Sequence, residues 1–162
     1  MQRSTFSRKT RGFSGTSKLL LEIGNQNKPK EFVEIFQFRK NSSTFRGDLS
    51  RLKQKGLIET KSTRDSLLVK ITEDGWFEYL RLKIEEANLL PEGKICIVVF
   101  DIPEKFKSKR NKLRIFLDKI GFLPLQKSVW IFQFDVAKIL RDFFNKTEMD
   151  EWIRIFIAEE QD

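Results

Sequence analysis

The sequence of 162 residues contains no histidine and only one cysteine. The lack of histidine excludes a histidine general base, a Ser-His-Asp triad and any zinc site with a histidine ligand. The lone Cys96 excludes a disulfide scaffold and a multi-thiolate metal centre. Because Cys96 lies inside an apolar run, we interpret it as a buried structural thiol rather than a reactive one.

Long apolar runs are missing as well. No stretch approaches the roughly 18 consecutive apolar residues that a membrane span needs. Residues 1–15 lack the apolar centre of a secretory signal. We therefore expect a cytoplasmic protein with no membrane partner.

Positive charge is what the sequence has in excess. Lys and Arg number 31 against 23 Asp and Glu, so the net charge is +8 and the pI about 9.6, which favours a polyanionic partner. Residues 1–15 hold four basic and no acidic residues, a net of +4, and they have little to bury. They predict a disordered basic arm, which either contacts phosphates or a minor groove or is a solvated tail without a partner.

Residues 16–88 begin with the apolar spacing of helices. The first helix has Thr16 or Ser17 as its N-cap and Gly24 as its end. Its apolar residues are Leu19, Leu20 and Ile23. Pro29 opens a second, short helix. The apolar residues of that helix are Phe32, Val33, Ile35 and Phe36.

A third helix is predicted over residues 44–55. Ser42 or Ser43 caps it, and Gly56 follows its end. Phe45, Leu49 and Leu52 recur at spacings of four and three and should face the core.

Two alternating runs, 57–61 and 66–71, then form a hairpin across the polar link 62–65. Residues 72–75 cap a final helix that runs to about residue 87. Three helices, a two-stranded wing and a closing helix predict a winged helix-turn-helix over residues 16–88. The segments 56–59 and 71–75 resemble the signature of bacterial and archaeal winged-helix regulators.

The second half, residues 93–162, follows a boundary at residues 89–93. It reads as strand 95–101, helix 108–119, strand 122–126, strand 128–134, helix 135–145 and strand 152–158. This βαββαβ order predicts a ferredoxin-like sandwich with both helices on one face of an antiparallel sheet. The fold class is therefore α+β, and 40% hydrophobic residues with sixteen Phe suffice for its core.

The third helix and the wing carry the candidate DNA contacts. With its apolar residues on the core, the helix can present cations for phosphates and small or polar side chains for base edges. Gly47 on that face would let DNA approach closely. The full set over the 43–56 helix, its approach and the 60–66 wing is Arg39, Lys40, Ser43, Thr44, Arg46, Gly47, Ser50, Arg51, Gln54, Lys61 and Arg64. The alternative is a winged helix used for protein contact, with a solvated basic face.

Asp101 ends an apolar strand and is the one candidate catalytic acid. As a nuclease residue it would bind magnesium, with the same carboxylate from a second protomer completing the site. One carboxylate per chain is a poor magnesium site, so we favour a capping or structural Asp101 and expect no cofactor. Glu104 is predicted to lie in the first turn of the next helix.

Two further features of this half have a structural and a functional interpretation. Six cations between residues 105 and 114 are either a solvated helix face balanced by Asp118 and nearby acids or a second phosphate-contacting surface. Trp130, Phe132 and Phe134 alternate along a strand and are interpreted as core or dimer-face residues rather than base-stacking platforms. Trp152, Ile155 and Ile157 are expected at an edge or in a dimer interface.

The segments 98–104, 109–114, 121–122 and 125–131 resemble two related families. One is the small ferredoxin-like subunit of CRISPR spacer acquisition, in which the acid that ends the first strand is the proposed metal ligand; Asp101 matches that position. The other is the PaaX-like repressor family, which controls phenylacetate catabolism and places a winged helix before this same fold, as here. The PaaX-like resemblance implies a homodimeric, DNA-binding transcriptional repressor.

In this interpretation, double-stranded DNA is the partner and the ferredoxin-like domain makes the dimer. An unidentified small-molecule effector is left open. The runner-up is a magnesium-dependent endonuclease or CRISPR-adaptation subunit that uses Asp101. A non-specific nucleic-acid binder of the toxin–antitoxin type is a third hypothesis.

Overall fold

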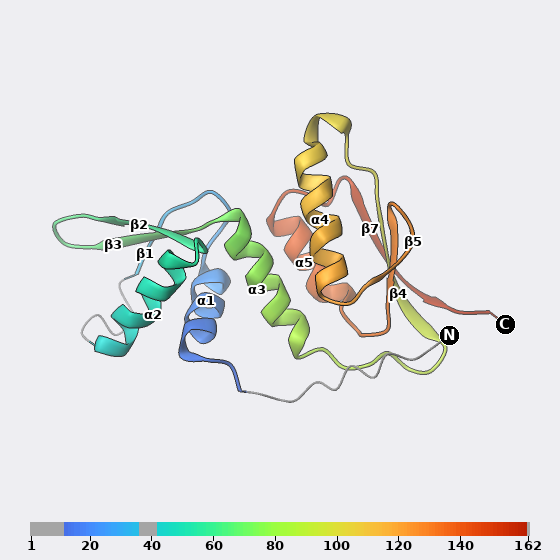
Figure 1. The fold of residues 1–162 in the computed structure, drawn as a ribbon, viewed down its shortest axis with the longest axis horizontal. Helices are drawn as coiled ribbons and strands as arrows, with labels where there is room; N and C mark the ends of the chain where they lie inside the picture. The colour runs from blue at the N-terminus through green and yellow to red at the C-terminus, as the bar shows by residue number, and fades with distance from the viewer. Residues whose placement is uncertain (1–11, 36–41, 162) are drawn as a thin grey trace.

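The structure, a computed structural model, describes residues 12–35 and 42–161. It is an α+β protein with two antiparallel sheets, one of three strands in the order β1-β3-β2 and one of four in the order β5-β6-β4-β7. The two sheets lie in different halves of the molecule, which meet through helices (Figure 1). The α+β class that the sequence predicted is confirmed.

The first half contains three helices and the smaller sheet. Its elements are α1 (Gly15–Gln26), β1 (Val33–Glu34), α2 (Ser43–Gln54), β2 (Ile58–Ser62), β3 (Leu67–Ile71) and α3 (Glu73–Glu85). The predicted hairpin is present as β2 and β3, which pair from Ile58 opposite Ile71 to Ser62 opposite Leu67. Thr72 caps α3 by accepting a hydrogen bond from the Gly75 backbone N–H.

The two ends of helix α1 differ from the predicted ones. The helix begins at Gly15, inside the range expected to be an arm. The capping residue is Ser14 rather than Thr16 or Ser17, because the Ser14 hydroxyl accepts a hydrogen bond from the Ser17 N–H. Gly24 does not end the helix. It lies within α1, where a Cβ would sit 2.3 Å from the Tyr79 ring, so its packing against α3 explains the glycine. The rest of the expected arm, residues 1–11, lies outside the described residues.

The predicted helix after Pro29 is wrong. Lys30 has a φ of +66°, and Val33 and Glu34 form strand β1, which pairs with Val69 and Leu68 of β3. Ile35 continues this pairing by donating its N–H to the Leu67 carbonyl at 3.0 Å. Val33 and Ile35 follow the period of two of an edge strand, and a partner strand 34 to 36 residues further along the chain supplies the hydrogen bonds. Phe36 lies outside the described residues.

The second half contains the larger sheet and two long helices. Its elements are β4 (Lys94–Phe100), the 3₁₀ turn η1 (Glu104–Phe106), α4 (Lys107–Lys119), β5 (Leu123–Gln126), β6 (Val129–Phe132), α5 (Ala137–Lys146) and β7 (Ile153–Glu159). The strands and helices follow the order expected from the sequence. β4 is central and pairs antiparallel with both β6 and β7.

Both long helices cover one face of this sheet (Figure 1). Cys96 and Val98 of β4 have no exposed surface, and they belong to the same buried cluster as Leu113 of α4 and Leu140 of α5. Trp130, Phe132 and Phe134 are each less than a tenth exposed, which confirms them as core residues rather than base-stacking platforms. Alternation along the strands turns the remaining side chains to the opposite face.

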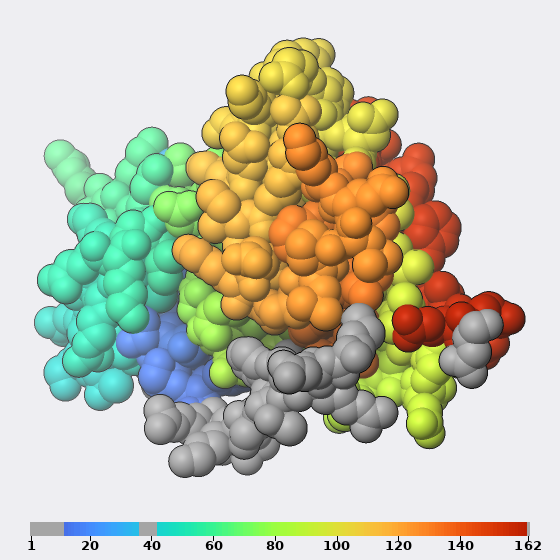
Figure 2. All heavy atoms as spheres, turned by 45° about the vertical axis from the view of Figure 1, so that its right-hand side comes forward, coloured from blue at the N-terminus to red at the C-terminus, as the bar shows by residue number. Residues whose placement is uncertain are grey.

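Helix α3 joins the two halves. Its Phe77 ring packs 4.9 Å from the Phe116 ring of α4 and 6.1 Å from the Phe143 ring of α5, centroid to centroid. Lys146 of α5 donates to the Gly24 carbonyl, and its ammonium lies 4.7 Å from the Trp76 ring centroid. Burial, and then the charge of Lys83, lowers the pKa of Lys146. Helix α2 and the hairpin thus lie at the opposite end of the molecule from β7, as Figures 1 and 2 both show.

Candidate nucleic-acid interface

Local sequence signals define both ends of helix α2. The Ser42 hydroxyl accepts a hydrogen bond from the Phe45 N–H at 3.0 Å, so of the two predicted caps Ser42 is the correct one. Gly56 follows the helix with a φ of +70°, a conformation that glycine adopts without strain. Leu52 is 1% exposed, and Phe45 and Leu49 pack against the same core. The buried face of α2 is the predicted one.

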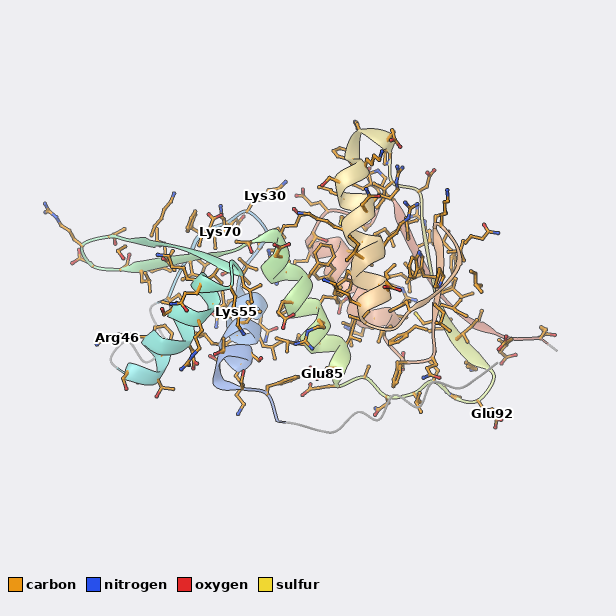
Figure 3. The ribbon with its side chains drawn as sticks, viewed as in Figure 1. Lys30, Arg46, Lys55, Lys70, Glu85 and Glu92 are labelled. Carbon is orange, nitrogen blue, oxygen red and sulfur yellow. The ribbon has the colours of Figure 1, made fainter. Side chains whose placement is uncertain are left out.

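The opposite side of α2, here called its outer face, consists of Ser43, Thr44, Arg46, Gly47, Ser50, Arg51 and Gln54. All are exposed except Gly47, which is half-buried. Arg46 projects from the first half of the helix, away from the rest of the molecule (Figure 3). A Cβ at Gly47 would meet only the Arg51 guanidinium, at 3.8 Å, so packing gives no reason for this glycine. Arg39 and Lys40 lie outside the described residues.

Asp48 is a member of this site that the sequence interpretation missed. It is 8% exposed and accepts hydrogen bonds from the Thr16 hydroxyl at 2.9 Å and from Arg51 Nη1 at 3.0 Å. The spacing of three between Asp48 and Arg51 was a signal for their ion pair. Thr16, 32 positions earlier in the chain, could not be paired with Asp48 from the sequence.

The wing carries exposed cations along strand β2 and in its turn. Arg64 is exposed in the turn, which the Thr63 and Ser66 side chains close by hydrogen bonding. The Lys61 ammonium lies 4.3 Å from the centroid of the Phe32 ring, and that of Lys70 lies 4.9 Å from it. The ring therefore holds the Lys61 ammonium over the sheet, whereas Arg64 lies in the turn of the hairpin.

Asp101 follows β4 directly and is exposed. Its backbone N–H donates to the Trp152 carbonyl at 2.9 Å. Within residues 12–35 and 42–161 its carboxylate has no hydrogen bond or ion pair. Pro103 precedes η1 and Phe106 precedes α4, and neither helix has a side-chain cap. Interpreting Asp101 as a helix cap is therefore wrong.

A family comparison applies to this half of the chain. Residues 91–162 match the family described as PaaX protein central Cas2-like domain. This half of the chain is therefore similar to the central domain of PaaX proteins. The match covers β4 to β7, and it confirms the resemblance on which the sequence interpretation rested. No curated protein matched the chain.

The match indicates a Cas2-like fold in the second half of the chain. Across the part of the chain that the structure describes, no three His, Cys, Asp or Glu side chains are grouped as metal ligands would be. The same residues contain no helix that is long and apolar enough to cross a bilayer.

The six cations of the PaaX-type domain between residues 105 and 114 divide into two groups. Arg110, Lys112 and Arg114 have partners: Glu104 at 2.7 Å, Glu73 at 3.0 Å and the Lys127 carbonyl at 2.8 Å, respectively. Lys105, Lys107 and Lys109 make no ion pair with any described residue. Glu104, one of the nearby acids expected to balance this segment, and Glu73 of α3 pair with it, whereas Asp118 makes no ion pair with any described residue.

Glu104 lies in η1, just before the helix in which it was predicted. Hydrogen bonding to Arg110, and then the charges of Arg110 and Lys107, lower the pKa of its carboxyl. Trp152 packs on Phe106 with ring centroids 4.8 Å apart, so it supports this turn. Ile155 packs against the core and Ile157 is 40% exposed.

Proposed function

We propose that this PaaX-like protein is a homodimeric, DNA-binding transcriptional repressor. The outer face of α2 and the 60–66 wing bind duplex DNA, and the Cas2-like half makes the dimer. In this proposal residues 16–88 form a winged helix-turn-helix domain and residues 93–162 a ferredoxin-like domain. The protein binds DNA without a resident cofactor.

The observation that carries this proposal is the composition of the outer face of α2. Two arginines, two serines, a threonine and a glutamine are all exposed there, around a glycine that packing does not require. Cations supply sequence-independent attraction to phosphates, and the shorter polar side chains can reach base edges. A helix of this composition beside a hairpin with exposed Lys61 and Arg64 suits a major groove and its flanking backbone.

The outer face of the four-stranded sheet supports a dimer. One apolar row crosses all four strands, because Leu123, Ile131, Ile97 and Phe156 are successive pairing partners. Leu123 and Phe156 at its ends are 54% and 51% exposed. An antiparallel sheet with one covered face ordinarily presents polar residues on the other, so an apolar row there suits association. A second copy could add the same row by two-fold symmetry.

The test is a fluorescence-anisotropy titration of duplex DNA from the gene's own upstream region against a scrambled duplex. It is run at two salt concentrations with magnesium present, and the DNA is recovered on a gel. Tight, selective binding to DNA that stays intact supports the regulator. Equal and weak binding to both duplexes refutes sequence-specific reading, and cleaved product would make the protein a nuclease.

A further inference from the structure

Asp48 is a buried acidic side chain beside the two arginines of the outer face of α2. Only Asn27 and Asp48 are buried among the polar and charged residues that the structure describes. Burying a carboxylate costs free energy unless hydrogen bonds or opposite charges compensate it. Thr16 and Arg51 both donate to Asp48 Oδ1, from two different helices.

The first turn of α1 holds Asp48 in place. Thr16 belongs to this turn, and a Cβ at Gly15 would lie 2.7 Å from Asp48 Oδ2. Glycine at position 15 therefore lets the carboxylate approach the start of α1. The positive end of the α1 dipole favours a negative charge there. Asp48 is thus fixed by contacts that do not involve Arg51.

The Arg51 guanidinium is held by Asp48 at one nitrogen, Nη1, and the rest of the group is exposed. The Arg51 side chain is 63% exposed, whereas that of Asp48 is 11% exposed. One of its five N–H donors is directed to Asp48, and the others remain available on the outer face of α2. An arginine fork that is already oriented loses less conformational entropy when it makes two parallel hydrogen bonds. Arg46, on the same face, has no such partner among the described residues.

We propose that Asp48 is a positioning residue for Arg51, and that Thr16 in turn holds Asp48. In this arrangement Arg51 contributes to sequence discrimination and not only to phosphate attraction. The carboxylate also lowers the net charge of α2, which weakens binding to DNA of any sequence. This inference rests on the proposed function, because it concerns how the same face distinguishes one duplex from another.

The first experiment compares wild type and Asp48→Asn on the upstream duplex and its scrambled control. Asparagine keeps the size of the side chain but removes the charge that orients Arg51. Binding to the scrambled duplex should tighten about twofold, because α2 gains net positive charge. Binding to the upstream duplex should weaken about fivefold, because Arg51 is no longer oriented. Selectivity, the ratio of the two affinities, should fall about tenfold.

A double-mutant cycle then separates positioning from general damage. Arg51→Gln should reduce selectivity about tenfold in the wild-type background and less than about twofold in Asp48→Asn. Arg46→Gln is the matched control, and its effect should be the same in both backgrounds. Additive losses for Asp48 and Arg51 would overturn the inference.

Thr16 offers a second route if Asp48→Asn folds poorly. Thr16→Val should reproduce the loss of selectivity. Thr16→Ser, which keeps the hydroxyl, should retain the selectivity of the wild type. An equal loss of affinity for both duplexes, together with a lower Tm, would assign Asp48 and Thr16 to stability alone. Failure of the proposed function looks different, because wild-type protein would then show no selectivity at all.

Discussion

Burial controls the chemistry of the single cysteine. Cys96 has no exposed surface, and burial raises the pKa of its thiol from an ordinary 9.0 to about 12, with a smaller rise from Asp135 and an opposing effect of Arg141. Because the thiolate is the reactive form, a thiol reagent at pH 8 should leave native protein unmodified and label urea-unfolded protein fully. Mass spectrometry of both samples measures this. Rapid labelling of native protein would contradict the buried position.

The raised pKa of Cys96 also determines whether the stability of the folded protein rises or falls with pH. Above about pH 9 an unfolded chain loses the Cys96 proton while the folded protein keeps it. The stability that this group contributes is therefore complete below pH 9 and is lost as pH rises toward 12. Urea unfolding of wild type and Cys96→Ala between pH 8 and 10.5 should show the steeper decline in wild type.

Asp101 is expected to be dispensable for DNA binding. Its exposed carboxylate makes no hydrogen bond or ion pair with any described residue, and it lies in the half of the chain that we assign to the dimer. Asp101→Asn should therefore bind the upstream duplex within about twofold of wild type, with or without magnesium, since exposed substitutions outside a binding face are usually near neutral. Anisotropy measures the affinity. A magnesium-dependent loss would instead identify a metal ligand.

At the scale of elements, two helical glycines should respond oppositely to alanine. Gly24→Ala places a Cβ 2.3 Å from the Tyr79 ring and should cost about 1–3 kcal/mol of unfolding free energy. Gly47→Ala meets only a movable arginine and should gain about 0.5–1 kcal/mol through helix propensity. Urea denaturation measures both changes. The stabilised Gly47→Ala should nevertheless bind DNA more weakly if the duplex approaches this position.

The wing provides a test in the salt dependence of binding. Arg64→Gln should reduce the slope of log affinity against log salt by about 1, because one phosphate contact is lost. Lys138→Gln is the control, since Lys138 is also exposed but lies on α5 and pairs with Asp142 at 2.8 Å. An unchanged slope for Arg64→Gln would remove the wing from the DNA interface.

At the scale of the whole molecule, the outer sheet face and α2 lie at opposite ends (Figure 1). Leu123→Glu and Phe156→Glu each place a charge in the exposed part of the apolar row, where two copies would meet. Both variants should elute as monomers in size-exclusion chromatography with light scattering, with unchanged circular dichroism. Their affinity for a two-half-site duplex should fall more than about tenfold, because one half-site is lost. Monomeric wild-type protein would exclude this dimer.

The elements that could be predicted are those specified by near neighbours in the chain. The cap of α2, the glycine at its end and the apolar spacing within it act over one to four residues. The 57–71 hairpin and the strand–helix order of residues 94–159 follow from the same local patterns. A strand as short as β1 has no such pattern of its own, and only its pairing with β3 makes it a strand.

The outer face of α2 was therefore determined by the sequence, since helix periodicity alone separates Arg46 and Arg51 from Leu52. Cys96 was likewise assigned to the core from the apolar run around it. Tertiary structure alone decided which charged side chains are paired within the protein and which remain available to a partner. It brought Thr16 to Asp48 and Glu73 to Lys112, pairs that are 32 and 39 residues apart. Sequence patterns report on which face a side chain lies, whereas its partner depends on how the helices pack.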